Sequence, residues 1–503
     1  MVHLLRQREA IPQTPAPWLK QLAVTLLSCF NRTNTWLDIG ESKGRIMAGH
    51  ERRASIAGFT RRRWLQGGGA ALASGIWPSL LAARSASPAP APARQAIIIY
   101  LQGGLSHYES FDPKPRAALE YRGEFQSIAT SLPGVQFCEH MPRLAARAHR
   151  FNVIRSTFVD SPSHEHAIHS SLTGWQPPGS PRILAGELVR NKLHPAVGAV
   201  VARGRGAECP GLPGYVTVPH AGQLGARVHY AGAGMLGVEY EPVDSGMPPI
   251  RADQTFTGPS DLRLSSKLNS RRIRDRLTLL DGMQRSDFSP LELEGLGPYH
   301  RQAYEILSGG AAAHAFNLSA EPQRVRERYG QHLWGQQTAL ARRLAEAGVP
   351  LTLMNFTLNQ VKGQDWDTHV NNFGLMKDVL LPPMDLAVST LLDDLDERGL
   401  LDTTLVAMFG EFGRTPRINN NAGRDHWEKV FSVMLAGGGL KSGMVLGSST
   451  RDGDLPLDRP VHLNDVLATI YHQLGVSCDE VIHDELDRPF PVLPHGTAVP
   501  ELL

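Results

Sequence analysis

The stretch TLVAMFGEFGRTPRINNNAGRDHW (residues 404–427) carries the clearest indication of the fold. It begins with an apolar run that is typical of a buried strand, and the run leads into Glu411 and Arg414. Asp425 and His426 follow near the end of the stretch. In open α/β sheets, ligands bind at the carboxyl ends of the strands, where loops present polar side chains. The stretch therefore predicts a strand of an α/β sheet that ends in a metal or oxyanion site.

The same alternation of strand and helix patterns continues on both sides of this stretch. QAIIIYL (residues 95–101) is a continuous apolar run, and further strands are expected at residues 151–155, 351–356 and 431–435. Helical patterns occupy residues 142–149, 340–347, 381–398 and 464–474. This order predicts an α/β fold with a mostly parallel sheet covered by helices on both faces. Residues 235–335 are polar, Arg-rich and helical in pattern, so we expect an inserted helical region there.

Composition excludes several classes of protein. The 503 residues include 51 basic and 49 acidic side chains, a balance that gives no reason to expect a nucleic-acid partner. The four cysteines show no CxxC spacing, which excludes a thiolate zinc framework. A disulfide between Cys138 and Cys209 is one alternative, but free buried thiols are the preferred interpretation.

The first part of the chain resembles an export signal. TRRRWLQ (residues 60–66) precedes a short Gly/Ala-rich apolar run and a Ser/Pro/Ala linker, as in twin-arginine signal peptides. The apolar run is too short for a comfortable membrane span, so we expect no permanent span. Residues 1–46 are expected to be a doubtful extension before a start at Met47, residues 47–94 the signal and linker, and residues 95–495 the folded domain. The alternative for the arginine-rich segment is a basic amphipathic surface helix.

This interpretation predicts a periplasmic or otherwise exported protein, with the twin-arginine export machinery as a transient partner. The pathway carries folded proteins, which would suit a metal loaded before export. The oligomeric state is left open by the sequence.

Candidate site residues gather in the loops that follow the expected strands. Carboxylate and imidazole groups ligate divalent metals, and cationic side chains hold oxyanions. The candidate metal ligands are Asp112, Asp367, His369, Glu411, Asp425 and His426. The candidate catalytic residues are Lys114, His164, His166 and Arg414. We expect a divalent ion, either zinc, calcium or manganese.

Each candidate also has a purely structural interpretation. Asp367 and His369 lie in a polar loop that could cap the next helix, and Glu411 could pair with Arg414 without any ligand. The histidines of DSPSHEHAIHSSLTG (residues 160–174), which are His164, His166 and His169, could be zinc ligands or could satisfy backbone groups at a helix start. Ser161 and Ser163 in the same loop are candidate nucleophiles with a histidine as base. His107 is a supporting candidate, and Lys114 could be solvated.

Several of these segments resemble the sulfatases and, more widely, the alkaline-phosphatase superfamily. The similar segments are residues 141–157, 161–174, 391–413, 431–443 and 461–476. Over about residues 95–480 the chain is most similar to the exported bacterial family known as domain of unknown function 1501. The motifs that carry this resemblance are FDPKP, CEHMPRLA, WDTH, GEFGRTP and GRDHW. The resemblance implies a sulfatase-like α/β sheet.

The chain departs from the sulfatase pattern at the site. Sulfatases carry two aspartates after the first strand, where this chain has Gly103 and Gly104. Their nucleophile position matches Asp160 in a gapped comparison and His164 in an ungapped one, and neither residue can become formylglycine. Their Asp-His-Gly becomes Glu411, Phe412 and Gly413 (residues 411–413). The resemblance therefore implies a shared sheet with a rewritten site.

Two functions remain open at this stage. The first is a metal-dependent hydrolase of sulfate or phosphate esters, whose substrate is a small-molecule or glycan anionic ester. In this hypothesis Arg414 and Lys114 neutralise the departing anion. The second is a non-catalytic cell-envelope binding protein that recognises an anionic glycan or a partner on a sulfatase-like scaffold. The fold alone does not decide between them.

Overall fold

The computed structural model describes residues 92–177, 194–207, 209–221, 228–262, 296–308, 310–356, 365–484 and 486–503, with a few short pieces between 189 and 279. By internal contacts the chain divides into residues 1–84 and 85–503, and all described residues belong to the second unit. The expected extension (1–46) and the twin-arginine segment (60–66) therefore lie outside the described residues. Within the described part, no helix has both the length and the apolarity needed to cross a membrane.

In the described part of the chain, nine strands form the main sheet. Their order along the sheet is β14 (Val445–Leu446), β4 (Asn152–Phe158), β13 (Phe431–Gly437), β10 (Thr404–Phe409), β1 (Gln95–Tyr100), β9 (Leu351–Asn355), β6 (Tyr215–Val218) and β8 (Val243–Asp244), and β17 (Val461–His462) also pairs with β4. β13 runs antiparallel to β10 and β4, and the other pairs are parallel. The expected mostly parallel sheet is confirmed.

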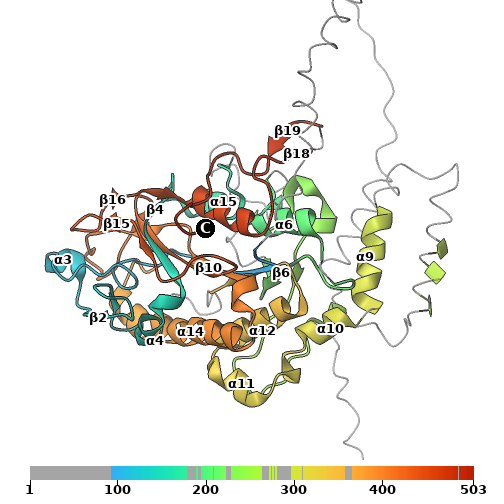
Figure 1. Cartoon of the computed structure of the whole chain (residues 1–503), viewed down its shortest axis with the longest axis horizontal. Coiled ribbons are helices and arrows are strands. Elements are labelled where there is room, and N and C mark those ends of the chain that lie inside the picture. The colour runs from blue at the N-terminus through green and yellow to red at the C-terminus, as the bar shows by residue number, and fades with distance from the viewer. Residues whose placement is uncertain are drawn as a thin grey trace, which may run out of the picture. The chain divides into compact units, whose positions relative to one another are not determined.

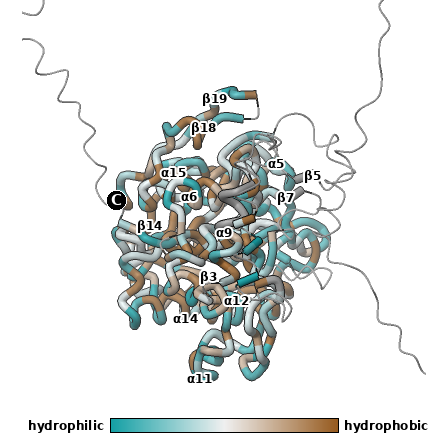
Figure 2. The backbone as a smooth tube through the Cα atoms, turned by 90° about the vertical axis from the view of Figure 1, so that its right-hand side faces the viewer, coloured by the Kyte–Doolittle hydropathy of each residue, from teal (hydrophilic) through white to brown (hydrophobic). Residues whose placement is uncertain are grey.

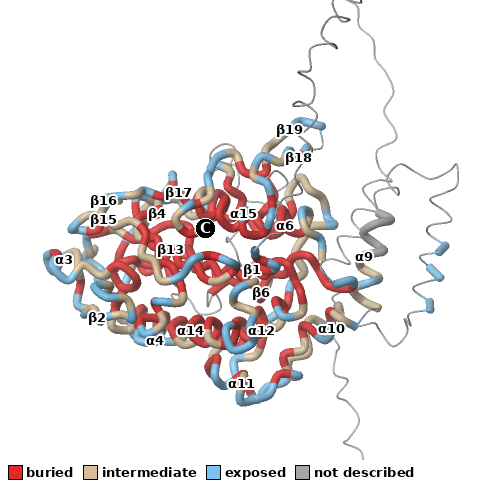
Figure 3. Tube along the Cα trace, in the orientation of Figure 1, coloured by how far each residue is buried: buried red, intermediate tan, exposed pale blue. Residues whose placement is uncertain are grey.

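The central strand β1 shows why the sheet needs helices on both faces. All six of its residues are buried, and successive side chains of a strand point to opposite faces. Ile98 and Tyr100 therefore belong to one hydrophobic cluster and Ile97 and Ile99 to the other. In Figure 2 the hydrophobic (brown) segments gather in the interior of the molecule, and Figure 3 shows the strands in the interior as buried (red).

Helices cover each cluster. The first cluster is covered by α5 (His164–Thr173), α6 (Val197–Arg205) and α15 (Leu463–Gln473). The second is covered by α4 (Pro142–Ala146), α12 (Leu333–Ala347) and α14 (Leu381–Glu397). Figure 1 shows α6 and α15 on one side of the strands and α12 and α14 on the other.

The remaining elements are short. The other helices are α3 (Leu119–Arg122), α9 (Leu296–Ser308), α10 (Ala311–Phe316), α11 (Gln323–Arg328) and α13 (Asn372–Leu375), followed by a π-helical turn at Met376–Leu380. Two-stranded pairs join β2 (Ser127–Ala129) to β3 (Gln136–Cys138), β5 (Val189–Arg190) to β7 (Val228–His229), β11 (Gly413–Arg414) to β12 (His426–Trp427), β15 (Ser448–Ser449) to β16 (Pro456–Asp458), and β18 (Val481–His483) to β19 (Pro489–Pro491).

The expected strands and helices are present with small differences in their bounds. The sequence patterns missed β6 and β8, which extend the sheet beyond β9, because both strands are short. β8 lies in the segment interpreted as a helical insertion, where α9, α10 and α11 account for the helical pattern. The described cysteines Cys138, Cys209 and Cys478 are all free, as expected, but the expectation that they are buried holds for Cys138 and is wrong for the exposed Cys209.

Candidate metal centre

Four strands of the main sheet that run in the same direction bring the site residues together. β4, β10, β1 and β9 point the same way, and ligands of such sheets bind at the carboxyl ends. His164 begins α5 after β4, Glu411 follows β10, and Asp367 lies in the segment after β9. His426 belongs to β12, which pairs with β11 just beyond β10. Residues that lie far apart in the chain therefore meet at the carboxyl ends of the parallel strands.

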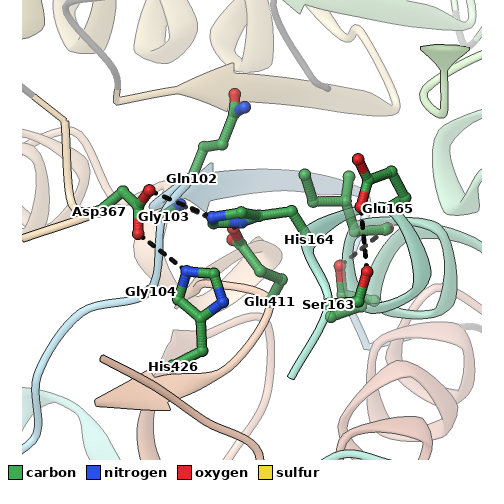
Figure 4. Close-up of polar contacts among 12 residues, drawn as sticks. Gln102, Gly103, Gly104, Ser163, His164, Glu165, Asp367, Glu411 and His426 are labelled. Atoms are coloured by element: carbon green, nitrogen blue, oxygen red, sulfur yellow. Dashed lines mark hydrogen bonds and ion pairs between the residues drawn. The ribbon is translucent and has the colours of Figure 1, made fainter. Parts of the chain in front are cut away.

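The Asp367 carboxylate is the centre of this cluster. Its Oδ2 lies 3.3 Å from His164 Nε2, and its Oδ1 lies 3.0 Å from the Nε2 atoms of both His426 and His369. Figure 4 shows the imidazoles of His164 and His426 turned toward the two oxygens of Asp367. The four side chains are 22–39% exposed, so solvent reaches them.

The outward nitrogen of each imidazole already has a hydrogen-bond acceptor. His164 Nδ1 lies 2.8 Å from Glu411 Oε1, and His369 Nδ1 lies 2.7 Å from Asp425 Oδ1. His426 Nδ1 lies 2.8 Å from the carbonyl oxygen of Pro162. Carboxylates and carbonyls accept, so each Nδ1 carries the proton and each Nε2 offers its lone pair when the ring is neutral. Metal-binding histidines have this arrangement, in which the other ring nitrogen donates to a carboxylate or carbonyl.

Two of these lone pairs face each other. His369 Nε2 and His426 Nε2 are 2.9 Å apart, and Asp367 Oδ1 lies between them in reach of both. Neutral rings with Nδ1–H tautomers would place two acceptors in contact there, so the arrangement needs a proton or a metal ion between them. Among the described residues, ligand atoms of His164, Asp367 and His426 all lie within 4.8 Å of one another, the spacing of a shared ion. His369 is not part of this group, but its Nε2 contacts both Asp367 and His426.

Charge in the cluster is unevenly distributed. Burial lowers the pKa of His164, but the Asp367 and Glu411 carboxylates outweigh it and raise that pKa to about 10. Burial raises the pKa of Asp367, yet His164, His426 and Arg414 hold it well below its usual range. The carboxylates thus favour positive charge at the place where the imidazoles converge.

Arg414 has a different role from the one expected. Its side chain is fully buried, and it donates to the carbonyl oxygens of Gly103, Gly104 and Arg424 and to Asp367 Oδ1 at 2.6 Å. It pairs with Asp367 rather than with Glu411. With these donors occupied, the guanidinium anchors a metal-ligand candidate and is not available to hold a departing anion.

Asp112 and Lys114 also differ from the expectation. Asp112 is buried, lies 2.9 Å from Lys114 Nζ and 3.5 Å from Arg155 Nη1, and accepts from Ser449 Oγ at 2.5 Å. Lys114 donates to it and, at 3.5 Å, to the Ser449 carbonyl. These contacts form a structural ion-pair cluster, so neither residue contributes a free group to the metal centre.

The other histidines of α5 lie away from the carboxylate. His169 is buried, and its Nε2 lies 3.0 Å from His194 Nδ1. Burial lowers the pKa of His169 to about 3, as expected of a neutral core histidine. His166 lies on the same helix and is not in the metal group. Ser163 donates to Glu165 Oε2 at 3.0 Å, and Figure 4 shows that pair on the far side of His164 from Asp367.

Gly103 and Gly104 explain the missing aspartates. A Cβ on Gly103 would lie 2.3 Å from the backbone nitrogen of Asp367, and one on Gly104 would lie 2.6 Å from the Phe412 carbonyl oxygen. Both residues also have positive φ angles of 109° and 88°. The space that a side chain would need is filled at Gly103 by the segment that contains Asp367 and at Gly104 by Phe412, and the carboxylate of the site comes from the segment after β9.

Backbone contacts join the two loops that supply His369 and Asp425. Arg424 donates its N–H to the Thr368 carbonyl, and Asn371 and Asn372 donate theirs to the carbonyls of Asn421 and Ala422. The Asn419 side chain spans the two loops, bonding the His369 carbonyl at 2.9 Å and Asp425 Oδ1 at 3.2 Å. The carboxylate and the imidazole are therefore held in place before any ligand binds.

The donor set decides which metals fit. Three imidazole nitrogens and one carboxylate oxygen suit zinc and similar first-row ions, and they also allow manganese. Calcium requires six to eight oxygen ligands, so the expected calcium alternative does not match these residues. Of the expected metal ligands, Asp367, His369 and His426 converge. Glu411 and Asp425 instead contact the Nδ1 atoms of His164 and His369. His164, which was expected to be catalytic, becomes a ligand candidate.

The fold and this cluster define an α/β protein with a histidine-rich candidate metal centre at its strand ends. The chain belongs to the family described as protein of unknown function (DUF1501), whose model matches residues 93–503. No curated protein sequence matches the chain.

Three solved structures illustrate the similarity of the fold. One is Ps i-CgsB in complex with k-i-k-neocarrahexaose, with 10% identity, a TM-score of 0.37, and coverage of 77% of this chain and 72% of that one. A protein in the alkaline phosphatase superfamily from Vibrio parahaemolyticus has 11% identity, a TM-score of 0.36, and coverage of 77% and 68%. The sulfatase PsFucS1 from Pseudoalteromonas sp. has 12% identity, a TM-score of 0.34, and coverage of 77% and 68%. The ligands of such distant proteins say nothing about those of this chain.

Proposed function

We propose that this protein is an exported metal-dependent hydrolase that acts on an anionic ester of the sulfate or phosphate class. The observation that carries the proposal is the convergence of three imidazole Nε2 atoms on the Asp367 carboxylate, with each Nδ1 already bonded. His164, Asp367, His369 and His426 would hold one divalent ion, with zinc or manganese matching the donors. When bound, such an ion supplies Lewis acidity toward an ester oxygen and makes water more acidic.

The chain's own groups would orient the ligands and the substrate. Arg414 fixes Asp367 from beneath, and the acceptors behind the three imidazoles keep the Nε2 atoms pointing inward. His164 is the first residue of α5, and the N-cap Ser163 makes no side-chain bond to the helix backbone. The positive end of the helix dipole favours an anionic group beside the ion.

The first test is metal content. Protein purified after export is analysed by inductively coupled plasma mass spectrometry, and wild type is compared with a His369→Ala/His426→Ala double variant. We expect close to one zinc or manganese ion per chain in wild type and almost none in the variant. Wild type is then assayed with aryl sulfates, phosphate monoesters and phosphate diesters. A well-folded wild type without metal under zinc-replete conditions would refute the proposal.

One observation favours a second candidate, a metal-dependent binding protein without turnover. Arg414 and Lys114, the cations expected to neutralise a leaving group, are both occupied by carbonyls and carboxylates. Near-stoichiometric metal combined with binding of a sulfated or phosphorylated glycan, and no hydrolysis of any ester, would establish this candidate instead.

A further inference from the structure

Glu411 lies where three parts of the fold meet. It follows the central strand β10, and its side chain is 0% exposed. Its Oε1 accepts a hydrogen bond from the Gly103 N–H at 2.8 Å, in the loop after β1, and contacts His164 Nδ1 at 2.8 Å, at the start of α5. Its Oε2 is buried and makes no hydrogen bond of standard geometry, although the buried Tyr100 side chain interacts with the carboxylate. Both donors act on the same oxygen.

A buried carboxylate with one oxygen that makes no hydrogen bond of standard geometry is costly to the fold. The same buried carboxylate fixes the His164 imidazole, because an immobile acceptor at Nδ1 sets both the tautomer and the orientation of the ring. The ring also packs against Phe412 and His426, with centroid distances of 5.0 and 4.3 Å. His164 Nε2 is therefore directed at Asp367 and held there from two sides.

Glu411 also acts on the carboxylate ligand through a chain of contacts. Gly103 donates its N–H to Glu411, and its carbonyl accepts from Arg414 Nη2. The same Nη2 donates to Asp367 Oδ1 at 2.6 Å. One buried side chain thus connects to His164 directly and to Asp367 through Gly103 and Arg414, so a change at Glu411 reaches two ligand candidates.

We propose that Glu411 is a positioning residue of the metal centre rather than a metal ligand, and that it fixes the orientation of His164 and the place of Asp367. This inference rests on the proposed function and deepens it, because it assigns the preorganisation of the ion site to a residue that does not touch the ion.

The chain offers a matched control. Asp425 stands behind His369 as Glu411 stands behind His164, at 2.7 Å from Nδ1, but its side chain is 54% exposed. Water can replace an exposed acceptor, whereas nothing replaces a buried one. Asp385 serves as the folding control, because it is a buried carboxylate that accepts the N–H groups of Arg143 and Leu144 at 2.9 and 2.8 Å.

The experiment measures zinc affinity by competition with a chromogenic chelator on the full chain, together with the visible absorption spectrum of the Co²⁺-loaded protein. The variants are Glu411→Gln, Glu411→Ala, Asp425→Asn and Asp385→Asn. Loss of such an outer partner weakens metal affinity about 10- to 100-fold. We expect a decrease of about 100-fold for E411A, about 10-fold for E411Q, and less than for E411Q in D425N. D385N should bind as wild type does.

The Co²⁺ spectrum separates positioning from general destabilisation. In E411A the ligand-field bands should shift, because one imidazole no longer reaches the ion, whereas D385N should keep the wild-type bands even where its unfolding midpoint falls. E411Q keeps the shape of the side chain and provides the decisive comparison where E411A fails to fold. Wild-type zinc affinity and spectrum in E411Q, or a D425N effect as large as that of E411Q, would overturn the proposal.

The outcomes also distinguish the two levels of the proposal. Zinc binding that depends on Glu411 in a protein without esterase activity would remove the hydrolase function and keep the positioning role. Esterase activity with zinc affinity independent of Glu411 would do the reverse. A wild-type chain that binds neither zinc nor Co²⁺ would overturn both.

Discussion

Two clusters of charged side chains in this protein differ in how their charges are matched. In the helical layer, Arg342 lies between two carboxylates, with Nη2 2.6 Å from Glu321 and Nε 2.9 Å from Asp394. Arg398 also pairs with Asp394 at 2.8 Å, and the Tyr329 hydroxyl donates to it at 2.7 Å. Guanidinium and carboxylate groups alternate, so each charge in the cluster is paired with an opposite charge of the chain itself, although Arg342 Nε and Nη2 make no hydrogen bond of standard geometry.

The metal centre lacks this alternation. His369 and His426 direct Nε2 atoms at each other and at one carboxylate, and their outer nitrogens are already bonded. A cation is needed where the Nε2 atoms meet. The comparison shows that buried charged side chains alone do not indicate a metal site. The informative observation is a group of acceptor atoms that converge on one point without a donor between them.

The largest expected effect tests the helical cluster. Arg342→Met should lower the free energy of unfolding by about 3–5 kcal/mol, because it leaves Glu321 and Asp394 buried without their main partner. Urea denaturation measures this loss. Zinc affinity of the folded variant should equal that of wild type, and a joint loss of stability and affinity would contradict the separation of the two clusters.

The second-largest expected effect is the stabilisation of the folded protein by zinc, which tests the metal centre. Free zinc at about 1,000 times its dissociation constant should raise the free energy of unfolding by about 4 kcal/mol, because the ion binds only the folded chain. The same denaturation series with and without zinc gives this increment. His164→Ala should remove most of it, whereas R342M should keep it. An increment of equal size in H164A would mean that zinc binds elsewhere.

A third prediction concerns acid sensitivity. Burial lowers the pKa of His107 from its ordinary 6.5 to about 4, although Asp112 favours the charged form. Above pH 6.5 the ring is neutral in both states, and below it only the unfolded chain takes up the proton, so stability falls as the pH falls toward 4. At about 1.4 kcal/mol per pKa unit, His107 accounts for about 3 kcal/mol of this loss.

The measurement is the free energy of unfolding of wild type and His107→Gln between pH 7 and pH 4. The wild-type curve should fall more steeply by that amount, because other buried histidines such as His332, whose pKa is also lowered to about 4, titrate in both proteins. Parallel curves would show that His107 accepts a proton in the folded protein.

The smallest expected effect concerns the two loops of the site. Asn419→Ala should cost about 1 kcal/mol in stability, because the side chain bonds the His369 carbonyl and the N–H groups of Asn421 and Gly423. Zinc affinity should decrease only a few-fold, since backbone contacts also join the loops. A loss of affinity greater than that of E411Q would place the main support of the site in the loops rather than at Glu411.

Much of the fold was readable from the sequence because its strands are strongly patterned. β1, β9 and β10 are apolar runs followed by polar loops, as is typical of buried parallel strands, and the antiparallel β13 is also a continuous apolar run. The short strands β6 and β8 have too few residues to show a period. The motifs around Asp367 and His426 pointed to the correct edge of the sheet, since carboxyl ends of parallel strands lie together.

The roles of individual residues within the site were harder to predict from the sequence. Asp112, Lys114, Asp367 and Arg414 are all charged residues in loops after strands, and only contacts distinguish the structural pairs from the open centre. The imidazole of His164 joined the ligand set because α5 starts where β4 ends, next to the segment after β9. Gly103 and Gly104 carried a signal for the close approach of Asp367 and Phe412 to the loop after β1, but not for the position of His164.

The sequence by itself determined the α/β class, the order of the main strands and the group of residues from which the site is built, because these depend on local hydrophobic pattern and on residue chemistry. Only the tertiary structure decided which groups are candidate ligands, which are outer acceptors and which are ordinary ion pairs. Those roles depend on distances of about 3 Å between side chains that lie far apart in the chain, such as His164 and Glu411, which are separated by 247 residues. Hydrophobic periodicity in the sequence does not specify such distances, whereas the packing of the strands and loops in the folded protein sets them.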